Sequence, residues 1–171
     1  MRHTISVLVE NKFGVLARVA GLFSARGYNI DSLAVGETED PTVSRMTIIS
    51  KGDDKTLEQI KKQLNKLIDV IKVVDFKEGG FVGRELMLIK VAVNAKNRND
   101  ALEAVESVGG RVVSALPDVI SIEVAGDSDK INGLIELLRP FGIIEMARTG
   151  RIALGTSEKG MKADGKPEVN E

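Results

Sequence analysis

The feature that most constrains the fold is an order of strand-like and helix-like segments that occurs twice along the chain. In the first half, alternating apolar residues predict strands over 5–10, 28–35, 43–51 and 70–77. Apolar residues at helical spacing predict one helix over 15–26 and a second that Asp53 or Asp54 caps. The resulting order is βαββαβ.

The second half repeats that order. Strands are predicted over 85–93, 111–116, 119–124 and 143–148, with one helix over 100–108 and another capped by Ser128 or Asp129 and ended by Pro140. We therefore expect an α+β chain of two ferredoxin-like βαββαβ domains, each an antiparallel sheet with helices on one face. The other face of each sheet needs a cover, which we expect from the other domain or a second chain. The expected boundaries are a first domain over 1–78, a linker over 79–84, a C-terminal ferredoxin-like domain over 85–155 and a flexible tail over 156–171.

Composition excludes several classes of function. The formal net charge of −1 gives no basic excess for nucleic acid. The chain has no cysteine and one histidine, His3, and no loop gathers carboxylates, so we expect no metal site. It also lacks a signal peptide and an apolar run of about 20 residues, which predicts a cytoplasmic protein that does not enter a membrane.

The first predicted strand-to-helix loop is the best candidate for a binding site. Gly14 permits a tight turn, and the helix beginning at Val15 then presents the free amides of its first turn to a carboxylate or phosphate. Asn11 and Asn29 could add side-chain amides. The loop lacks the lysine and extra glycines of a phosphate loop, so it suits a zwitterion better. On spacing alone, ordinary turn and loop roles for these residues outweigh a ligand site.

Longer stretches around this loop resemble a known family. Residues 11–19 resemble the start of an ACT domain, and residues 21–33, followed by 40–41 and 44–48, resemble the small regulatory subunit of acetolactate synthase. The resemblance continues through 57–67 and, more loosely, through the second domain, so it covers most of the chain.

The resemblance implies an effector site between two chains. In that family the ACT domains, here residues 1–78, pair side by side and merge their sheets. A branched-chain amino acid, chiefly valine, binds between the first loop of one chain and the second strand of its partner. The loop positions match Asn11, Gly14, Val15 and Leu16, and the strand positions match Asn29 and Ile30. Phe13 departs from the proline that many ACT loops carry before the glycine.

The resemblance also implies a catalytic partner. The family's small subunit activates a large subunit that uses thiamine diphosphate, magnesium and FAD, and it confers feedback inhibition in branched-chain amino acid biosynthesis. We therefore expect a regulatory subunit with no catalytic residue, cofactor or metal of its own. One alternative is a stand-alone amino-acid sensor or transcriptional regulator, which would need a helix-turn-helix or a basic segment. The other is an enzyme, which would need a nucleophile with a base, or paired carboxylates. None of these features is visible in the sequence.

Overall fold

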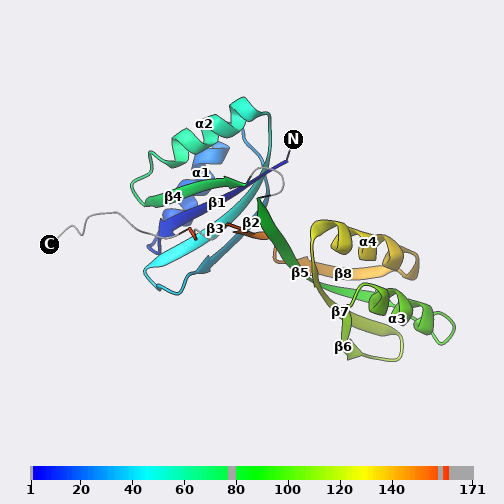
Figure 1. The fold of residues 1–171 in the computed structure, drawn as a ribbon. Coiled ribbons are helices and arrows are strands. Elements are labelled where there is room, and N and C mark those ends of the chain that lie inside the picture. The colour runs from blue at the N-terminus through cyan, green and yellow to red at the C-terminus, as the bar shows by residue number, and fades with distance from the viewer. Residues whose placement is uncertain (1, 77–79, 158–159, 162–171) are drawn as a thin grey trace. The chain divides into compact units, whose positions relative to one another are not determined.

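The protein divides into two compact units. The computed structural model describes residues 2–76, 80–157 and 160–161. Unit 1 comprises Met1–Val82 and Ala153–Glu171, and unit 2 comprises Gly83–Ile152. Chain segments from both ends of the sequence therefore belong to unit 1 (Figure 1).

Unit 1 contains the first βαββαβ motif, as predicted. Its elements are β1 (Arg2–Glu10), α1 (Val15–Ser24), β2 (Ile30–Glu37), β3 (Val43–Lys51), α2 (Asp54–Leu64) and β4 (Val70–Phe76). The strands form an antiparallel sheet in the order β2-β3-β1-β4, which places β2 at one edge.

The alternation of β1 decides which face of this sheet meets the helices. Ile5, Val7 and Val9 are β-branched residues that suit a strand, and they pack with Val19 of α1 and Ile60 of α2 in one buried cluster. Asp53 caps α2 by accepting from the Thr56 amide at 2.7 Å, so one of the two predicted caps is confirmed. Helices therefore cover one face, and Thr4, Ser6 and Leu8 of β1 lie on the other.

Unit 2 contains the second motif. Its elements are β5 (Phe81–Ala92), α3 (Arg98–Ser107), β6 (Arg111–Ala115), β7 (Val119–Gly126), α4 (Ser128–Leu138), the 3-10 turn η1 (Arg139–Phe141) and β8 (Ile143–Arg148). The sheet order is β6-β7-β5-β8, again antiparallel, and a further strand, β9 (Ile152–Gly155), pairs with β5. The predicted α+β class with two ferredoxin-like motifs is confirmed.

Three details differ from the sequence-based expectation. Asp127 caps α4, because its carboxylate accepts from the Lys130 amide at 2.9 Å, whereas the expected caps Ser128 and Asp129 lie within the helix. Residues 81–84, expected in the linker, belong to β5, and β9 was not expected. Of the predicted tail, 158–159 and 162–171 lie outside the described residues. No described helix is long and apolar enough to cross a membrane.

Candidate functional site

The loop between β1 and α1 places a bare helix end at the surface. Gly14 has φ 81° and ψ −7°, a left-handed conformation in which a side chain is strained, and it caps α1 without a side-chain hydrogen bond. Among the described residues, the amides of Leu16 and Ala17 have no acceptor, and both residues are exposed. These donors and the positive end of the helix dipole can hold a carboxylate.

The Val15 amide contributes less than predicted. It donates to the carbonyl oxygen of Lys12 at 3.4 Å, a long bond, and the Val15 side chain is buried in the core. Val15 therefore anchors the helix, and Leu16, whose side chain is 44% exposed, is the apolar residue that can reach a ligand.

A charged pair that the sequence analysis missed lies beside this helix end. Arg18 donates through Nη1 to Asp69 Oδ2, and a methyl group added at Gly14 would lie 3.6 Å from Arg18 Nη2. The Arg18 guanidinium therefore adds positive charge next to Gly14. Phe13, the residue that departs from the ACT pattern, is fully exposed at this end of the helix.

Asn11 is fixed by the turn between β2 and β3. Its backbone amide donates to the carbonyl oxygen of Thr42 at 2.7 Å. Its Nδ2 donates to Glu37 Oε1 at 3.0 Å and to the carbonyl oxygen of Pro41 at 2.9 Å. Both donor hydrogens are thus used, and Oδ1 remains the atom suited to accept a bond from an ammonium group. Glu37 and Pro41 are therefore contacts of Asn11 that sequence analysis did not identify.

Asn29 and Ile30 lie just before and at the start of β2. Asn29 Nδ2 donates to Asp31 Oδ1 at 2.8 Å, and its carbonyl oxygen accepts from Ser50 Oγ at 2.8 Å. Asn29 is exposed, whereas Ile30 is partly buried and packs against the core of unit 1. Ile30 is therefore held in place before any ligand arrives.

The two halves of the predicted site lie at opposite ends of one sheet. Ile30 pairs with Ser50, whereas Glu37, which holds Asn11, pairs with Ser44. A strand rises about 3.3 Å per residue, so the seven steps from Ile30 to Glu37 span roughly 23 Å. A single chain therefore does not bring Asn11 and Asn29 to one ligand.

No described group of three or more His, Cys, Asp or Glu side chains could hold a metal ion. His3 hydrogen-bonds through Nε2 to the carbonyl oxygen of Gly52 at 3.0 Å. This bond gives His3 a structural partner near the N-terminal end of β1.

Both units match families of known proteins. Residues 5–72 match the family described as AHAS small subunit-like ACT domain, and residues 84–157 match the family described as small subunit of acetolactate synthase. Together the two matches cover nearly all of the described residues.

Individual relatives agree over almost the whole chain. A probable acetolactate synthase small subunit from Methanothermobacter thermautotrophicus is 52% identical over 160 residues, which are 93% of this chain and 95% of that protein. The acetolactate synthase isozyme 3 small subunit of Salmonella typhimurium is 45% identical over 163 residues, covering 95% of this chain and 100% of that protein. The crystal structure of the acetolactate synthase small subunit from Thermotoga maritima superposes with a TM-score of 0.86 at 40% identity, covering 93% of this chain and 99% of that one.

Proposed function

This chain belongs to the family of acetolactate synthase small subunits, and from that premise we propose that it is the regulatory partner of a catalytic acetolactate synthase chain. It carries out no chemical step itself. It activates the catalytic chain and makes that chain respond to the end product of branched-chain amino acid biosynthesis. Thiamine diphosphate, magnesium and FAD are bound by the catalytic chain.

The effector site forms between two copies of unit 1. Strand β2 lies at the edge of its sheet, so its free edge is available to a second β2. Antiparallel pairing of two such edges brings the Ile30 end of one strand beside the Glu37 end of the other. Asn29 of one chain then approaches Asn11 of the other, since Glu37 holds Asn11 at that end. The separation of the two half-sites within one chain is the observation that carries this proposal.

The proposed ligand is a branched-chain amino acid, chiefly valine. The amides of the first turn of α1 bind its carboxylate, and Gly14 leaves the space for that approach. Asn11 Oδ1 and the Asn29 side chain of the second copy orient the ammonium group. Leu16 and Ile30 line the aliphatic part of the pocket. A single methylene changes affinity by only about 1–3 kcal/mol, so leucine and isoleucine are expected to compete.

Feedback inhibition requires that valine favour one arrangement of the assembly over another. A coupling free energy of about 1–3 kcal/mol between effector and partner suffices, and a ligand that contacts two chains can supply it. The free energy of valine binding then stabilises the arrangement in which the two β2 edges are in register.

The decisive experiment mixes this chain with a cognate acetolactate synthase catalytic chain and measures pyruvate turnover with and without valine. We expect stimulation on mixing and inhibition on adding valine. Asn11→Ala is the site variant, and Asn94→Ala in unit 2 is its control, because Asn94 is also an exposed loop asparagine with a local hydrogen bond. Valine binding without any effect on turnover would favour a stand-alone sensor. The absence of both stimulation and valine binding would refute the proposal.

A further inference from the structure

Asp31 is the second residue of β2, and its carboxylate lies beside the side chain of Asn29. Resting on the proposed function, we propose that Asp31 is a positioning residue, which turns the Asn29 amide so that Oδ1 faces the ammonium group of the ligand. It acts through Asn29, and its own position is fixed by two cations on neighbouring strands.

Asn29 is held at two points. Its Nδ2 donates to Asp31 Oδ1 at 2.8 Å, and its carbonyl oxygen accepts from Ser50 Oγ at 2.8 Å. Ser50 is 1% exposed, so the second bond ties the backbone of an exposed residue to the interior of unit 1. The Asn29 side chain therefore extends from a fixed backbone, and Asp31 sets its direction.

The Asp31 carboxylate decides which way the Asn29 amide faces. An ionised carboxylate can only accept hydrogen bonds, so the amide must turn its NH2 group toward it. The amide oxygen, on the other side of the same carbon atom, then points away from Asp31. Asn29 Oδ1 is thus the atom suited to accept a bond from an ammonium group.

Two cations hold the Asp31 carboxylate in place. Its Oδ2 lies 3.5 Å from Arg2 Nε and 3.4 Å from Lys51 Nζ, and its side chain is 11% exposed. The two carboxylate oxygens therefore have separate partners, since Oδ1 accepts from Asn29 and Oδ2 faces the cations. This division fixes the direction of the carboxylate.

Strand pairing explains why these cations need an acidic partner. Arg2 of β1 and Lys51 of β3 are direct partners in the antiparallel register. Like charges directly opposite each other destabilise such a pair. Asp31 reaches both cations and offsets their repulsion, so the stability of the sheet favours the same placement that orients Asn29.

An irregularity in β2 brings Asp31 into this position. Ile30 pairs with Ser50 and Ser32 with Ile49, so Asp31 is an extra residue opposite two consecutive partners on β3. Such a bulge re-aims a side chain and is common beside functional sites. Here it lies directly after Asn29 and Ile30, the half-site proposed for the second copy.

The other half-site uses the same arrangement. Asn11 Nδ2 donates to a carboxylate oxygen of Glu37, as Asn29 Nδ2 donates to one of Asp31. In the antiparallel pairing proposed above, one asparagine comes from each copy. Both amide oxygens can then face one ammonium group, which needs acceptors and offers only donors.

The test replaces Asp31 by a side chain of the same shape. In Asp31→Asn the single oxygen stays with the two cations, so the NH2 group faces Asn29 and forces its amide to turn over. Asp75→Asn is the matched control, because Asp75 is also a strand aspartate with a side chain only 5% exposed, 3.8 Å from Lys61 Nζ. It lies on β4, at the opposite edge of the same sheet.

Two further variants separate orientation from stability. Asp31→Glu keeps both acceptor oxygens. Asp31→Asn combined with Lys51→Gln removes one of the two repelling cations, and it serves as the test variant if Asp31→Asn alone does not fold. Each full-length chain is measured for valine binding by calorimetry, and the side-chain amide signals of Asn29 are recorded by NMR without valine.

We expect Asp31→Asn, alone or with Lys51→Gln, to raise the valine Kd by about tenfold, the effect of losing one hydrogen bond to a charged group. The Asn29 side-chain signals should shift in the same variants. Asp31→Glu should recover part of the affinity. Asp75→Asn, at a distant site, should leave the valine Kd within about twofold and the Asn29 signals unchanged.

An unchanged valine Kd in Asp31→Asn would overturn the role of Asp31. Weaker binding with the Asn29 signals of the parent would also overturn it, because Asp31 would then act by another route. An equal loss in Asp75→Asn would assign the effect to stability and overturn it as well. Absence of valine binding in the parent chain would instead refute the proposed function.

Discussion

Asn11 Nδ2 donates to Glu37 Oε1 at 3.0 Å, joining the first loop to the end of the edge strand β2. The two residues are 26 positions apart in the sequence. Their contact leaves Asn11 Oδ1 available to an ammonium group at the edge where a second β2 strand would pair. The orientation of Asn11 therefore depends on the Glu37 carboxylate.

Replacement of Glu37 tests this dependence. In Glu37→Ala, the Asn11 side chain loses a charge-assisted acceptor and rotates more freely, so we expect valine to bind about tenfold more weakly, or about 1.4 kcal/mol. Calorimetry on the purified chain measures the change. Glu39→Ala is the control, since Glu39 is an exposed glutamate in the same turn. Equal affinities of the two variants would contradict the role of Glu37.

The positive φ of Gly14 gives a second prediction. Gly14→Ala places a side chain in a left-handed conformation and should lower the free energy of unfolding by about 1–2 kcal/mol. Gly14→Asp should also abolish valine binding, because its carboxylate would occupy the position proposed for the ligand's carboxylate.

The control for Gly14 lies in the same helix. Gly21 sits within α1 with nothing within 4 Å of an added methyl group, so Gly21→Ala should stabilise the chain by about 0.4–1 kcal/mol. Urea denaturation followed by circular dichroism compares the variants. Similar shifts for both alanine variants would rule out a special conformation at Gly14.

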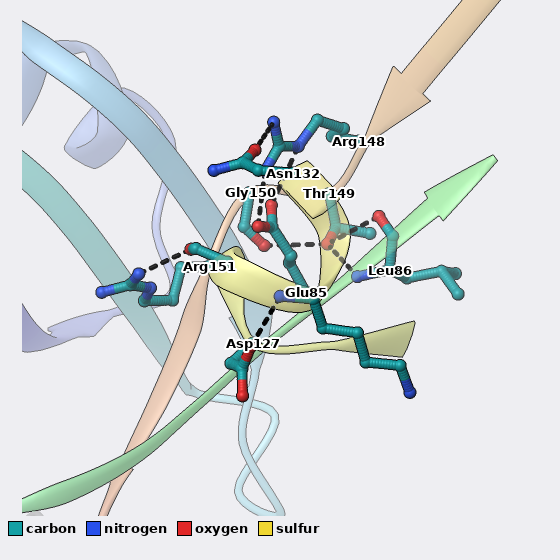
Figure 2. Close-up of polar contacts among 10 residues, drawn as sticks. Glu85, Leu86, Asp127, Asn132, Arg148, Thr149, Gly150 and Arg151 are labelled. Atoms are coloured by element: carbon teal, nitrogen blue, oxygen red, sulfur yellow. Dashed lines mark hydrogen bonds and ion pairs between the residues drawn. The ribbon is translucent and has the colours of Figure 1, made fainter. Parts of the chain in front are cut away.

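Loss of the ion pair between Glu85 and Arg148 (Figure 2) should strongly destabilise unit 2. Glu85→Ala leaves a guanidinium that is 31% exposed without its carboxylate, so we expect a loss of about 2–3 kcal/mol, discounted for that exposure. Hydrogen exchange of the β7 amides measures it. Glu123→Ala breaks the more exposed pair with Arg111 and should cost less than about 1 kcal/mol. Comparable losses would show that burial of Glu85 does not matter.

The turn after β2 should respond to acid. The Thr42 hydroxyl and then its backbone amide hydrogen-bond to Asp40, and these bonds hold the pKa of that carboxylate below its usual value. The stabilisation they give is therefore complete above the ordinary aspartate pKa and is lost as the pH falls through the lowered one.

A carboxyl titration by NMR checks the Asp40 prediction. Thr42→Val removes the hydroxyl and should raise the pKa of Asp40 toward its ordinary value, whereas Thr38→Val keeps both bonds from Thr42 to Asp40 and should change it less. An unchanged pKa in Thr42→Val would assign the shift to another group.

Local periodicity accounts for what the sequence predicted well. The alternation of Ile5, Val7 and Val9 and the helical spacing of Leu57, Ile60 and Leu64 depend on neighbouring residues alone, and both βαββαβ motifs follow from such patterns. The cap of α4 was misassigned because Asp127, Ser128 and Asp129 are three consecutive candidates, and only the geometry singles out the carboxylate that reaches Lys130.

Most of the missed features depend on contacts between distant residues. Glu37 and Asp69 join the candidate site through pairs 26 and 51 positions apart, and Arg45 reaches Ala153 across 108 positions. A strand as short as β9 carries too few residues for an alternation to stand out. No signal in a single sequence joins such pairs.

The placement of Asn11 and Asn29 at opposite ends of β2 has a consequence for mixtures of defective chains. If a site takes one asparagine from each copy, an Asn11→Ala chain paired with an Asn29→Ala chain holds one doubly impaired pocket and one intact pocket. Two preparations that each fail to bind valine would, once allowed to exchange subunits, recover up to a quarter of the pockets of the parent protein. Complementation between two inactive alleles would thus follow from the geometry of the sheet.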